Sequence, residues 1–479
     1  MSATIMESRK KTLFGHPVGL FVLFFTEMWE RFSFYGMRAI LILFLTDKVS
    51  ETGIGGGLGI EESTAQIIYG VYGFLVYMMS IPGGFLADKY LGQKKSVLLG
   101  GVLLVIGPAL LTAQGLMGGM MKEVLFFLGL FVITMGVGAL KPNISTMVGG
   151  LYEPGDQKRD MGFSIFYIGI NVGALLSALV DSLIAKNYGW AYGFGCAGIG
   201  MAFGLVVYLL GQGTLRGVGE LQKSGSESVK KKELAPLTGI EKDRIKVLLI
   251  SFLVVIVFWG SFEQAGGLMN LYAQNKVDRS VEATSLIGQF LSYVNSDGQP
   301  IVPAGWFQAV NAFFIMIFAT IVAAFWAKWG RSGKENSSLF KMGLGTIIMG
   351  LGFLFMVSAT NEYDLVGSAS MNWLFGAYFL HTIGELCLSP VALSFITQLT
   401  PERYASRMMG YYFAVTGLGN LVAGLLGSLS SQLGEKNLFL FITAFAVFAG
   451  VVVLVFLKQL KKLTHGAEDY VPAAVKEAA

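Results

Sequence analysis

The chain has 479 residues, of which 54% are hydrophobic, 13% aromatic and only 14% charged. Soluble chains average about 25% charged residues, so the composition excludes an ordinary water-soluble protein, and the formal net charge of +4 gives no reason to expect a nucleic-acid partner. We therefore expect a polytopic protein whose main partner is the lipid bilayer. Its two cysteines, Cys196 and Cys387, lie in separate apolar runs and indicate neither a metal site nor a disulfide, and no cofactor is expected.

Twelve apolar segments are long enough to cross a bilayer, because about 20 helical residues span its hydrocarbon. They divide six and six around a polar segment that is rich in Gly, Ser and Lys. The expected spans are residues 17–45, 65–86, 96–116, 124–149, 161–183, 191–211, 246–270, 305–327, 340–360, 371–399, 406–431 and 437–460.

Lysine and arginine determine the expected orientation, because they concentrate in cytoplasmic loops. If the N-terminus is cytoplasmic, most of the 35 Lys and Arg residues lie inside. The outer loops then hold only Lys48, Lys122, Lys186, Lys276, Arg279 and Lys436. We expect both termini in the cytoplasm, with an N-terminal segment (1–16), a six-helix bundle (17–211), a linker (212–245), a second bundle (246–462) and a tail (463–479).

Two six-helix bundles joined by a cytoplasmic linker are typical of the major facilitator fold, whose binding site lies between the halves near the bilayer midplane. The loop at residues 83–95 resembles the acidic and basic motif of that superfamily. The resemblance implies that Asp88 braces the cytoplasmic ends of helices, and the alternative is an ordinary basic inner turn.

The first span carries four charges, which is costly in hydrocarbon and rarely without a function. Glu27 and Arg31 are four residues apart and therefore share a helix face, which Tyr35 continues. Glu30 and Arg38 complete the set, and Arg38 is seven residues from Arg31 and so lies on the same side. This helix must turn a polar face to protein or water. The alternative, an ion pair that only anchors the start of the span, does not explain the depth of Arg38.

Three further spans contain ionisable residues. Lys141 lies in an otherwise apolar stretch and needs a carboxylate, from the protein or from a substrate. In the seventh span Trp259 and Glu263 are four apart, which predicts one polar wall of a cavity.

The tenth span has His381, Glu385 and Ser389 at four-residue intervals, a polar stripe along one helix. A packed histidine is the favoured interpretation of His381. Glu385 is harder to explain without a function.

The two halves differ in the sign of their charges. Arg31, Arg38 and Lys141 belong to the first half, whereas Glu263 and Glu385 belong to the second. A ligand with an anionic end and a cationic end would lie between them, which fits zwitterionic peptides and amino acids and excludes simple sugars.

Several motifs, in both halves, resemble those of the proton-dependent oligopeptide transporter family, a peptide transporter family of the major facilitator superfamily. Residues 27–32 (EMWERF) resemble its E-x-x-E-R-F signature, and residues 163–173 resemble its second signature. The other matching segments are residues 138–143, 306–311 and 384–390.

The resemblance implies a role for each matching residue. Arg38 and Lys141 would hold the peptide carboxylate, and Glu385 with Asn171 and Asn311 would receive the amine. The implied lining of the side-chain pockets is Tyr35, Tyr77, Trp259 and Tyr412, with Ser389 on the stripe of Glu385. The implied proton-coupling residues are Glu27, Glu30, Arg31 and Glu263.

Two features depart from the family pattern. Many members have Tyr where this chain has Phe34, so a hydroxyl contact to substrate is absent. Bacterial members usually insert two helices between the halves, and residues 212–245 are too short and polar for them.

The resemblance implies proton-coupled symport of di- and tripeptides by alternating access, by a monomer in a plasma membrane, here a bacterial inner membrane. The outer gate would close by pairing of Arg31 or Arg38 with Glu263. The alternatives are a nitrate-like small-anion transporter, which has no use for Glu385, an intramembrane enzyme, and a peptide sensor. No nucleophile and base pair indicates an enzyme.

Overall fold

The computed structural model describes residues 12–50, 56–153, 156, 158–221, 237–401 and 404–467. Most of the predicted segment 1–16, the middle of the predicted linker 212–245 and most of the predicted tail 463–479 lie outside these residues. The described part is almost entirely helical, as the spans predict.

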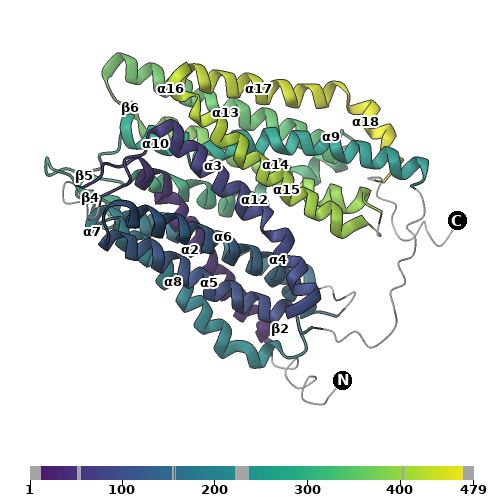
Figure 1. Ribbon diagram of the computed structural model, residues 1–479. Coiled ribbons are helices and arrows are strands. Elements are labelled where there is room, and N and C mark those ends of the chain that lie inside the picture. Colours follow the sequence, from purple (N-terminus) through teal and green to yellow (C-terminus); the bar gives the residue numbers. More distant parts are fainter. Residues whose placement is uncertain are drawn as a thin grey trace.

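The first half of the described chain forms most of the lower part of the molecule in Figure 1, coloured purple to teal, and its α3 lies against the helices of the second half. Its elements are β1 (Thr12–Leu13), β2 (His16–Pro17), α2 (Val18–Thr46), α3 (Glu62–Met78), α4 (Ser80–Leu86), η1 (Ala87–Leu91), α5 (Gln93–Ala113), η2 (Gln114–Leu116), α6 (Gly119–Gly150), α7 (Lys158–Tyr188), α8 (Trp190–Gly211) and η3 (Gln212–Leu215).

The second half forms the upper part, coloured teal to yellow. Its elements are α9 (Gly239–Phe262), η4 (Glu263–Ala265), α10 (Leu268–Lys276), β3 (Val277–Asp278), α11 (Leu286–Phe290), β4 (Tyr293–Val294), β5 (Pro300–Ile301), η5 (Ala304–Phe307), α12 (Gln308–Arg331), α13 (Ser338–Val366), β6 (Ala369–Ser370), α14 (Met371–Leu399), α15 (Ala405–Ser428), α16 (Ser430–Leu433), α17 (Glu435–Val455) and α18 (Leu457–Leu463).

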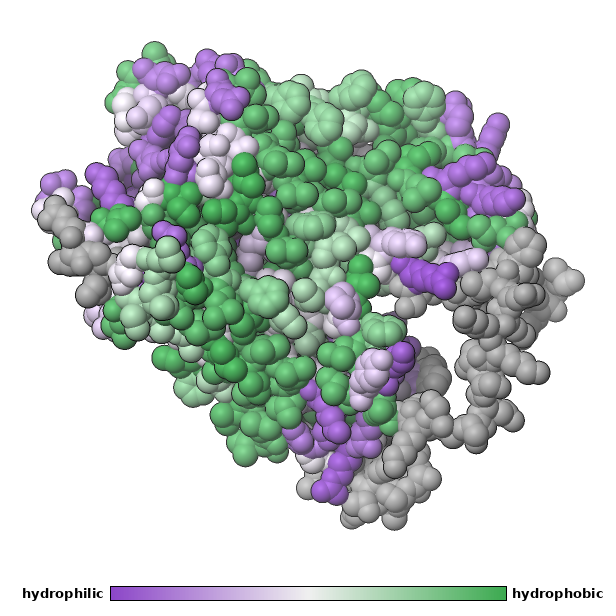
Figure 2. All heavy atoms as spheres, viewed as in Figure 1, coloured by the Kyte–Doolittle hydropathy of each residue, from purple (hydrophilic) through white to green (hydrophobic). Residues whose placement is uncertain are grey.

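Eleven helices of the described chain are long and apolar enough to cross a membrane. The remaining predicted span is α2, which has 29 residues and is long enough to cross. It contains Glu27, Glu30, Arg31 and Arg38, and with so many charges its composition alone does not identify it as a membrane span. Figure 2 shows an apolar belt over the helices, with hydrophilic residues gathered at both ends. This distribution fits a protein that crosses a bilayer along the long axes of its helices.

The second predicted span is not one straight helix. It breaks at Met79 between α3 and α4, and then continues into the π-helical turn η1, which ends at Leu91 and is followed by Gly92. Pro82 has no N–H to donate to the turn before it, which accounts for the break. Gly92 has φ of +76°, a conformation that favours glycine, and so allows the sharp turn into α5.

The seventh predicted span is also interrupted. Helix α9 begins with a capping box, in which the Thr238 side chain and Glu241 satisfy each other's backbone N–H groups, and the α-helix ends at Phe262. The 3₁₀ turn η4 follows, and α10 resumes after Gly266 and Gly267. A Cβ on either glycine would overlap a side chain of α3, so the interruption allows the two halves to approach closely there.

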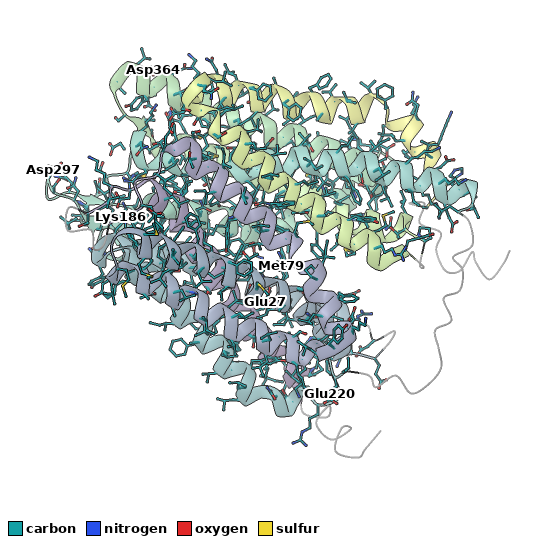
Figure 3. All side chains as sticks on the ribbon, viewed as in Figure 1. Glu27, Met79, Lys186, Glu220, Asp297 and Asp364 are labelled. Atoms are coloured by element: carbon teal, nitrogen blue, oxygen red, sulfur yellow. The ribbon has the colours of Figure 1, made fainter. Side chains whose placement is uncertain are left out.

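Helices pack mainly within their own half, and the halves meet along two lines. Helix α3 packs against α15, where a Cβ on Gly70 would lie 2.7 Å from the Gly424 Cα, and α7 packs against α12 and η5. At one end of the molecule, short strands in the loops between helices pair with one another: β3 is parallel to β6, and β4 is antiparallel to β5. In Figure 3 Lys186, Asp297 and Asp364 lie at that end, Glu220 at the other, and Glu27 between them.

Candidate functional site

A cavity of about 270 Å³ lies between the two halves. Helices α2, α3 and α7 line it from one side, and α9, η4, α12 and α14 line it from the other. Most of the predicted substrate and coupling residues are part of its wall: Tyr35, Arg38, Tyr77, Asn171, Trp259, Glu263, Asn311, Glu385 and Ser389.

Arg38 joins the two halves across this cavity. Its guanidinium forms an ion pair with Glu263 of η4, and the two side chains are only 11% and 6% exposed. Its Nε also donates a hydrogen bond to the Tyr69 hydroxyl at 2.6 Å. The predicted pairing of Arg38 with Glu263 is therefore present, and it places one positive and one negative charge where α2 meets the interrupted span.

Glu385 on α14 lines the same cavity. It accepts a hydrogen bond from Asn311 Nδ2 at 2.8 Å, and the same amide nitrogen donates to Thr382 Oγ1 at 3.0 Å. In the described chain Glu385 forms no salt bridge. A carboxylate that is oriented by an amide and lacks a cation is suited to bind a cationic ligand group.

Glu27, Glu30 and Arg31 form a buried cluster on α2. The Arg31 Nε lies 2.9 Å from Glu27 Oε1 and 2.5 Å from Glu30 Oε2, and all three side chains are at most 4% exposed. Two carboxylates therefore share one guanidinium. Lys141 is close enough to Glu30 to interact with it electrostatically and adds a second positive charge to the cluster.

Lys141 itself does not line the cavity, although the sequence predicted it there. Its Nζ lies 4.2 Å from the centroid of the Tyr77 ring, and Tyr77 does line the cavity. Lys141 is on α6, which contributes no residue to the cavity wall, and its side chain is half-buried against the tyrosine that does line it. This geometry connects the cluster of Glu27, Glu30 and Arg31 to the cavity through a lysine and an aromatic ring.

Three other predicted residues lie outside the cavity wall. Tyr412 on α15 is close to Tyr77, behind the cavity. His381 is 1% exposed, and its ring centroid lies 4.4 Å from that of Phe353, which supports its interpretation as a packed residue. Asp88 lies in η1 at the other end of the first half, beside a surface depression lined also by Gly92 and Glu220.

Several residues of the cavity were not predicted from the sequence. Tyr69 binds Arg38, although it does not itself line the cavity, and Tyr167, Gln308 and Tyr378 do line it. Tyr69 precedes Tyr77 by eight residues, two helical turns, so the stripe on α3 could have identified it. Among the described residues, no three His, Cys, Asp or Glu side chains gather closely enough to hold a metal ion.

Comparison with known proteins assigns the family. The family model described as POT family matches residues 94–238 and 239–441. The chain is 33% identical to the peptide transporter YePEPT of Yersinia enterocolitica, covering 87% of this chain and 88% of that one. It is 30% identical to a di-/tripeptide transporter of Lactococcus lactis subsp. cremoris, covering 96% and 98% of the two chains.

Solved structures agree with the sequence comparisons. A mutant of a peptide transporter POT in complex with alafosfalin is 32% identical and matches with a TM-score of 0.84, over 96% of this chain and 98% of that one. A POT family transporter in complex with 5-aminolevulinic acid is 31% identical and matches with a TM-score of 0.83, over 95% and 99%. The fold is thus the major facilitator fold that the sequence predicted, and the chain belongs to the POT family of peptide transporters.

Proposed function

We propose that this chain is a proton-coupled symporter that carries di- and tripeptides into the cell by alternating access. Peptide transport follows from the family. The observation that supports the substrate best is the cavity itself, which has the guanidinium of Arg38 from the first half and the unpaired carboxylate of Glu385 from the second. A peptide has one anionic and one cationic end, and these two groups complement them.

The peptide carboxylate would bind at Arg38. In this state Arg38 is held by Glu263 and Tyr69, so an entering carboxylate competes with Glu263 for the guanidinium. A desolvated carboxylate that loses its cation is stabilised by binding a proton. Substrate binding at Arg38 therefore favours protonation of Glu263, which gives a direct physical route from substrate to proton.

The peptide amine would bind at Glu385, with Asn311 and Asn171 beside it. Asn311 already orients the carboxylate, and Asn171 lines the same space. Side chains of the peptide would lie against Tyr35, Tyr77 and other aromatic residues of the wall, whose apolar contact is not directional and tolerates many side chains.

The buried cluster of Glu27, Glu30 and Arg31 is the second proposed proton site. Lys141, close to Glu30 and over the ring of Tyr77, would transmit a change in cavity charge to it. One proton that moves inward is worth about 2.3 kcal/mol per 100 mV of membrane potential, enough for about fiftyfold accumulation.

We place the protein in the plasma membrane, a bacterial inner membrane, with both termini in the cytoplasm and with residues 17–211 and 246–462 as the moving halves. It would act as a monomer, with Asp88 bracing the cytoplasmic helix ends. The lysine and arginine distribution supports this orientation.

The competing functions predict different outcomes. A nitrate-like transporter would not need Glu385, an intramembrane enzyme would convert its substrate without a gradient, and a peptide sensor would bind without flux. The decisive experiment is counterflow of a labelled dipeptide in proteoliposomes, with free amino acids, tripeptides and nitrate as competitors. Competition by di- and tripeptides only is the expected result, and competition by nitrate or absence of flux would reject the proposal.

A further inference from the structure

Asp181 on α7 is a buried carboxyl group for which neither the cavity nor the cluster of Glu27, Glu30 and Arg31 accounts. It is 0% exposed, and among the described residues its carboxyl oxygens find no hydrogen-bond donor stronger than the thiol of Cys196, which is a weak one. Its Oδ2 lies directly against Gly36 of α2, where a Cβ would overlap it. An ionised carboxylate that only a thiol contacts costs several kcal/mol in such a place, so this burial favours the neutral acid.

No charged side chain of the neighbouring described elements compensates Asp181. On α2, the two cations are both engaged elsewhere, Arg38 with Glu263 and Tyr69, and Arg31 with Glu27 and Glu30. On α7 itself, the Lys186 Nζ lies 5.0 Å from the Trp190 ring centroid, one turn further out.

The other elements packed around Asp181 are uncharged at this point. Helix α8 contributes the thiol of Cys196 and the backbone of Gly193. The segment from η5 to α12 faces the same part of α7 with Gly305 and Ala309. Among the described residues, the thiol of Cys196 is the titratable group that interacts with Asp181.

Asp181 lies between the cavity and the outer contact of the two halves. Ala178, one turn before it on α7, lines the cavity. Ser182, the next residue, packs against Gly305 of the second half, where a Cβ would overlap the Ser182 hydroxyl and lie 3.0 Å from the Ala39 carbonyl oxygen. That same carbonyl accepts a hydrogen bond from Asn270 Nδ2 at 2.9 Å. This contact covers Asp181 on its outer side.

From this position we infer that Asp181 is a proton-binding site of the outer gate, distinct from the sites that drive transport. When Ser182 and Gly305 separate, external water reaches the carboxylate, which takes a proton from hydronium and leaves water. The halves close only over the neutral acid, and on reopening the proton returns to the external solution. The inference rests on the proposed alternating access, and it makes closure of the outer gate depend on external pH.

The test compares dipeptide counterflow by the wild type and by Asp181→Asn, whose amide mimics the protonated acid. The ratio of variant to wild-type rate should rise with pH between about pH 6 and about pH 8, by up to about tenfold per unit, because only the wild type must bind this proton before closing. Raising the external pH alone should reproduce the rise, and raising the internal pH alone should not. The number of protons carried per peptide should be unchanged.

Two controls keep the result interpretable. Asp160→Asn, in the exposed first turn of the same helix, should give a ratio independent of pH. If Asp181→Asn folds poorly, Asp181→Ser is also neutral and should behave in the same way. A ratio that does not change with pH, a response to internal pH, or the loss of one transported proton would each overturn the inference.

A measurement on the wild type needs no variant. A hydrophobic carbodiimide reacts with protonated carboxyl groups in membranes, and mass spectrometry can locate the product. Modification of Asp181 should fall as external pH rises and should not respond to internal pH, and the opposite pattern would contradict the inference. If the wild type shows no peptide counterflow at any pH, the transport proposal fails, whereas this labelling still decides the role of Asp181.

Discussion

Replacement of Glu263 by glutamine tests the proposed link between substrate and proton. Glutamine has the same shape and can still accept a hydrogen bond from Arg38, but it carries no charge and binds no proton. The variant therefore fixes position 263 in a state that resembles the protonated acid. We expect Glu263→Gln to retain dipeptide counterflow and to lose accumulation driven by a proton gradient.

The magnitude follows from the environment of the ion pair. Removing one partner of a fully buried ion pair costs about 3–5 kcal/mol. The side chains of Arg38 and Glu263 are 11% and 6% exposed, and Arg38 keeps Tyr69 as a second partner. We therefore expect the loss of the charge at position 263 to cost about 2 kcal/mol. That cost corresponds to a factor of about 30 in the equilibrium between the closed and open outer gate.

The assay is uptake into proteoliposomes, measured once as counterflow and once with an imposed proton gradient. Glu282→Gln, at an exposed position of the loop after α10, is the matched control and should behave as wild type. Proton-driven accumulation that survives in Glu263→Gln would refute the coupling role, and so would a loss of counterflow equal to the loss of accumulation.

Three other predictions follow from the site and from the cytoplasmic ends. Glu385→Ala should weaken dipeptide binding by about 10–100-fold, measured by calorimetry, because a charge-assisted contact is worth about 1.5–3 kcal/mol. Lys141→Ala should reduce proton-driven uptake more than dipeptide affinity, since this ammonium interacts with Glu30 and with the Tyr77 ring and does not itself line the cavity; an equal loss in both would contradict that geometry. Burial alone would raise the pKa of Glu335, but hydrogen bonds from Ser337 and the ion pair with Lys461 outweigh it and hold the pKa at about 2, below its usual 4.5. The stabilisation that Glu335 contributes is therefore present above about pH 4.5 and is lost as the pH falls through about 2. Near pH 7, Glu335→Gln should lower the unfolding temperature slightly, because a partly exposed pair of this kind is worth less than about 1 kcal/mol. Near pH 2 the same substitution should have no effect on the unfolding temperature.

The charged residues within spans were the most informative part of the sequence. Charges are so costly in hydrocarbon that their presence in the first, seventh and tenth spans already indicated a shared polar interior. The structure places Arg38, Glu263 and Glu385 on one cavity, which the four-residue spacing could not establish, because spacing identifies a helix face and not its neighbour. The family signatures supplied that missing information.

Other features depend on tertiary packing and could not be predicted. The sequence predicts Lys141 in the cavity wall, but α6 contributes no residue to it, and Lys141 instead lies against Tyr77, which does line it. The sequence predicts one span over residues 246–270 and gives no sign of the interruption at Gly266 and Gly267, because glycine is common in membrane helices and only the approach of α3 shows why this pair is needed. Nor does the sequence single out Asp181, since it stands near the end of an apolar run and shares no periodic pattern with other charges.

The central claim is that Arg38 and Glu385 bind opposite ends of one peptide. It is tested most directly by binding of three ligands, a free dipeptide, its N-acetyl form and its C-terminal amide, to the wild type, to Arg38→Gln and to Glu385→Gln. We predict that each blocked end weakens wild-type binding by about 10–100-fold. Glu385→Gln should lose only the preference for a free amine, and Arg38→Gln should lose only the preference for a free carboxylate. Two results would contradict the account. One is equal binding of the three ligands by the wild type. The other is the reverse assignment, in which Glu385→Gln loses the preference for a free carboxylate and Arg38→Gln the preference for a free amine.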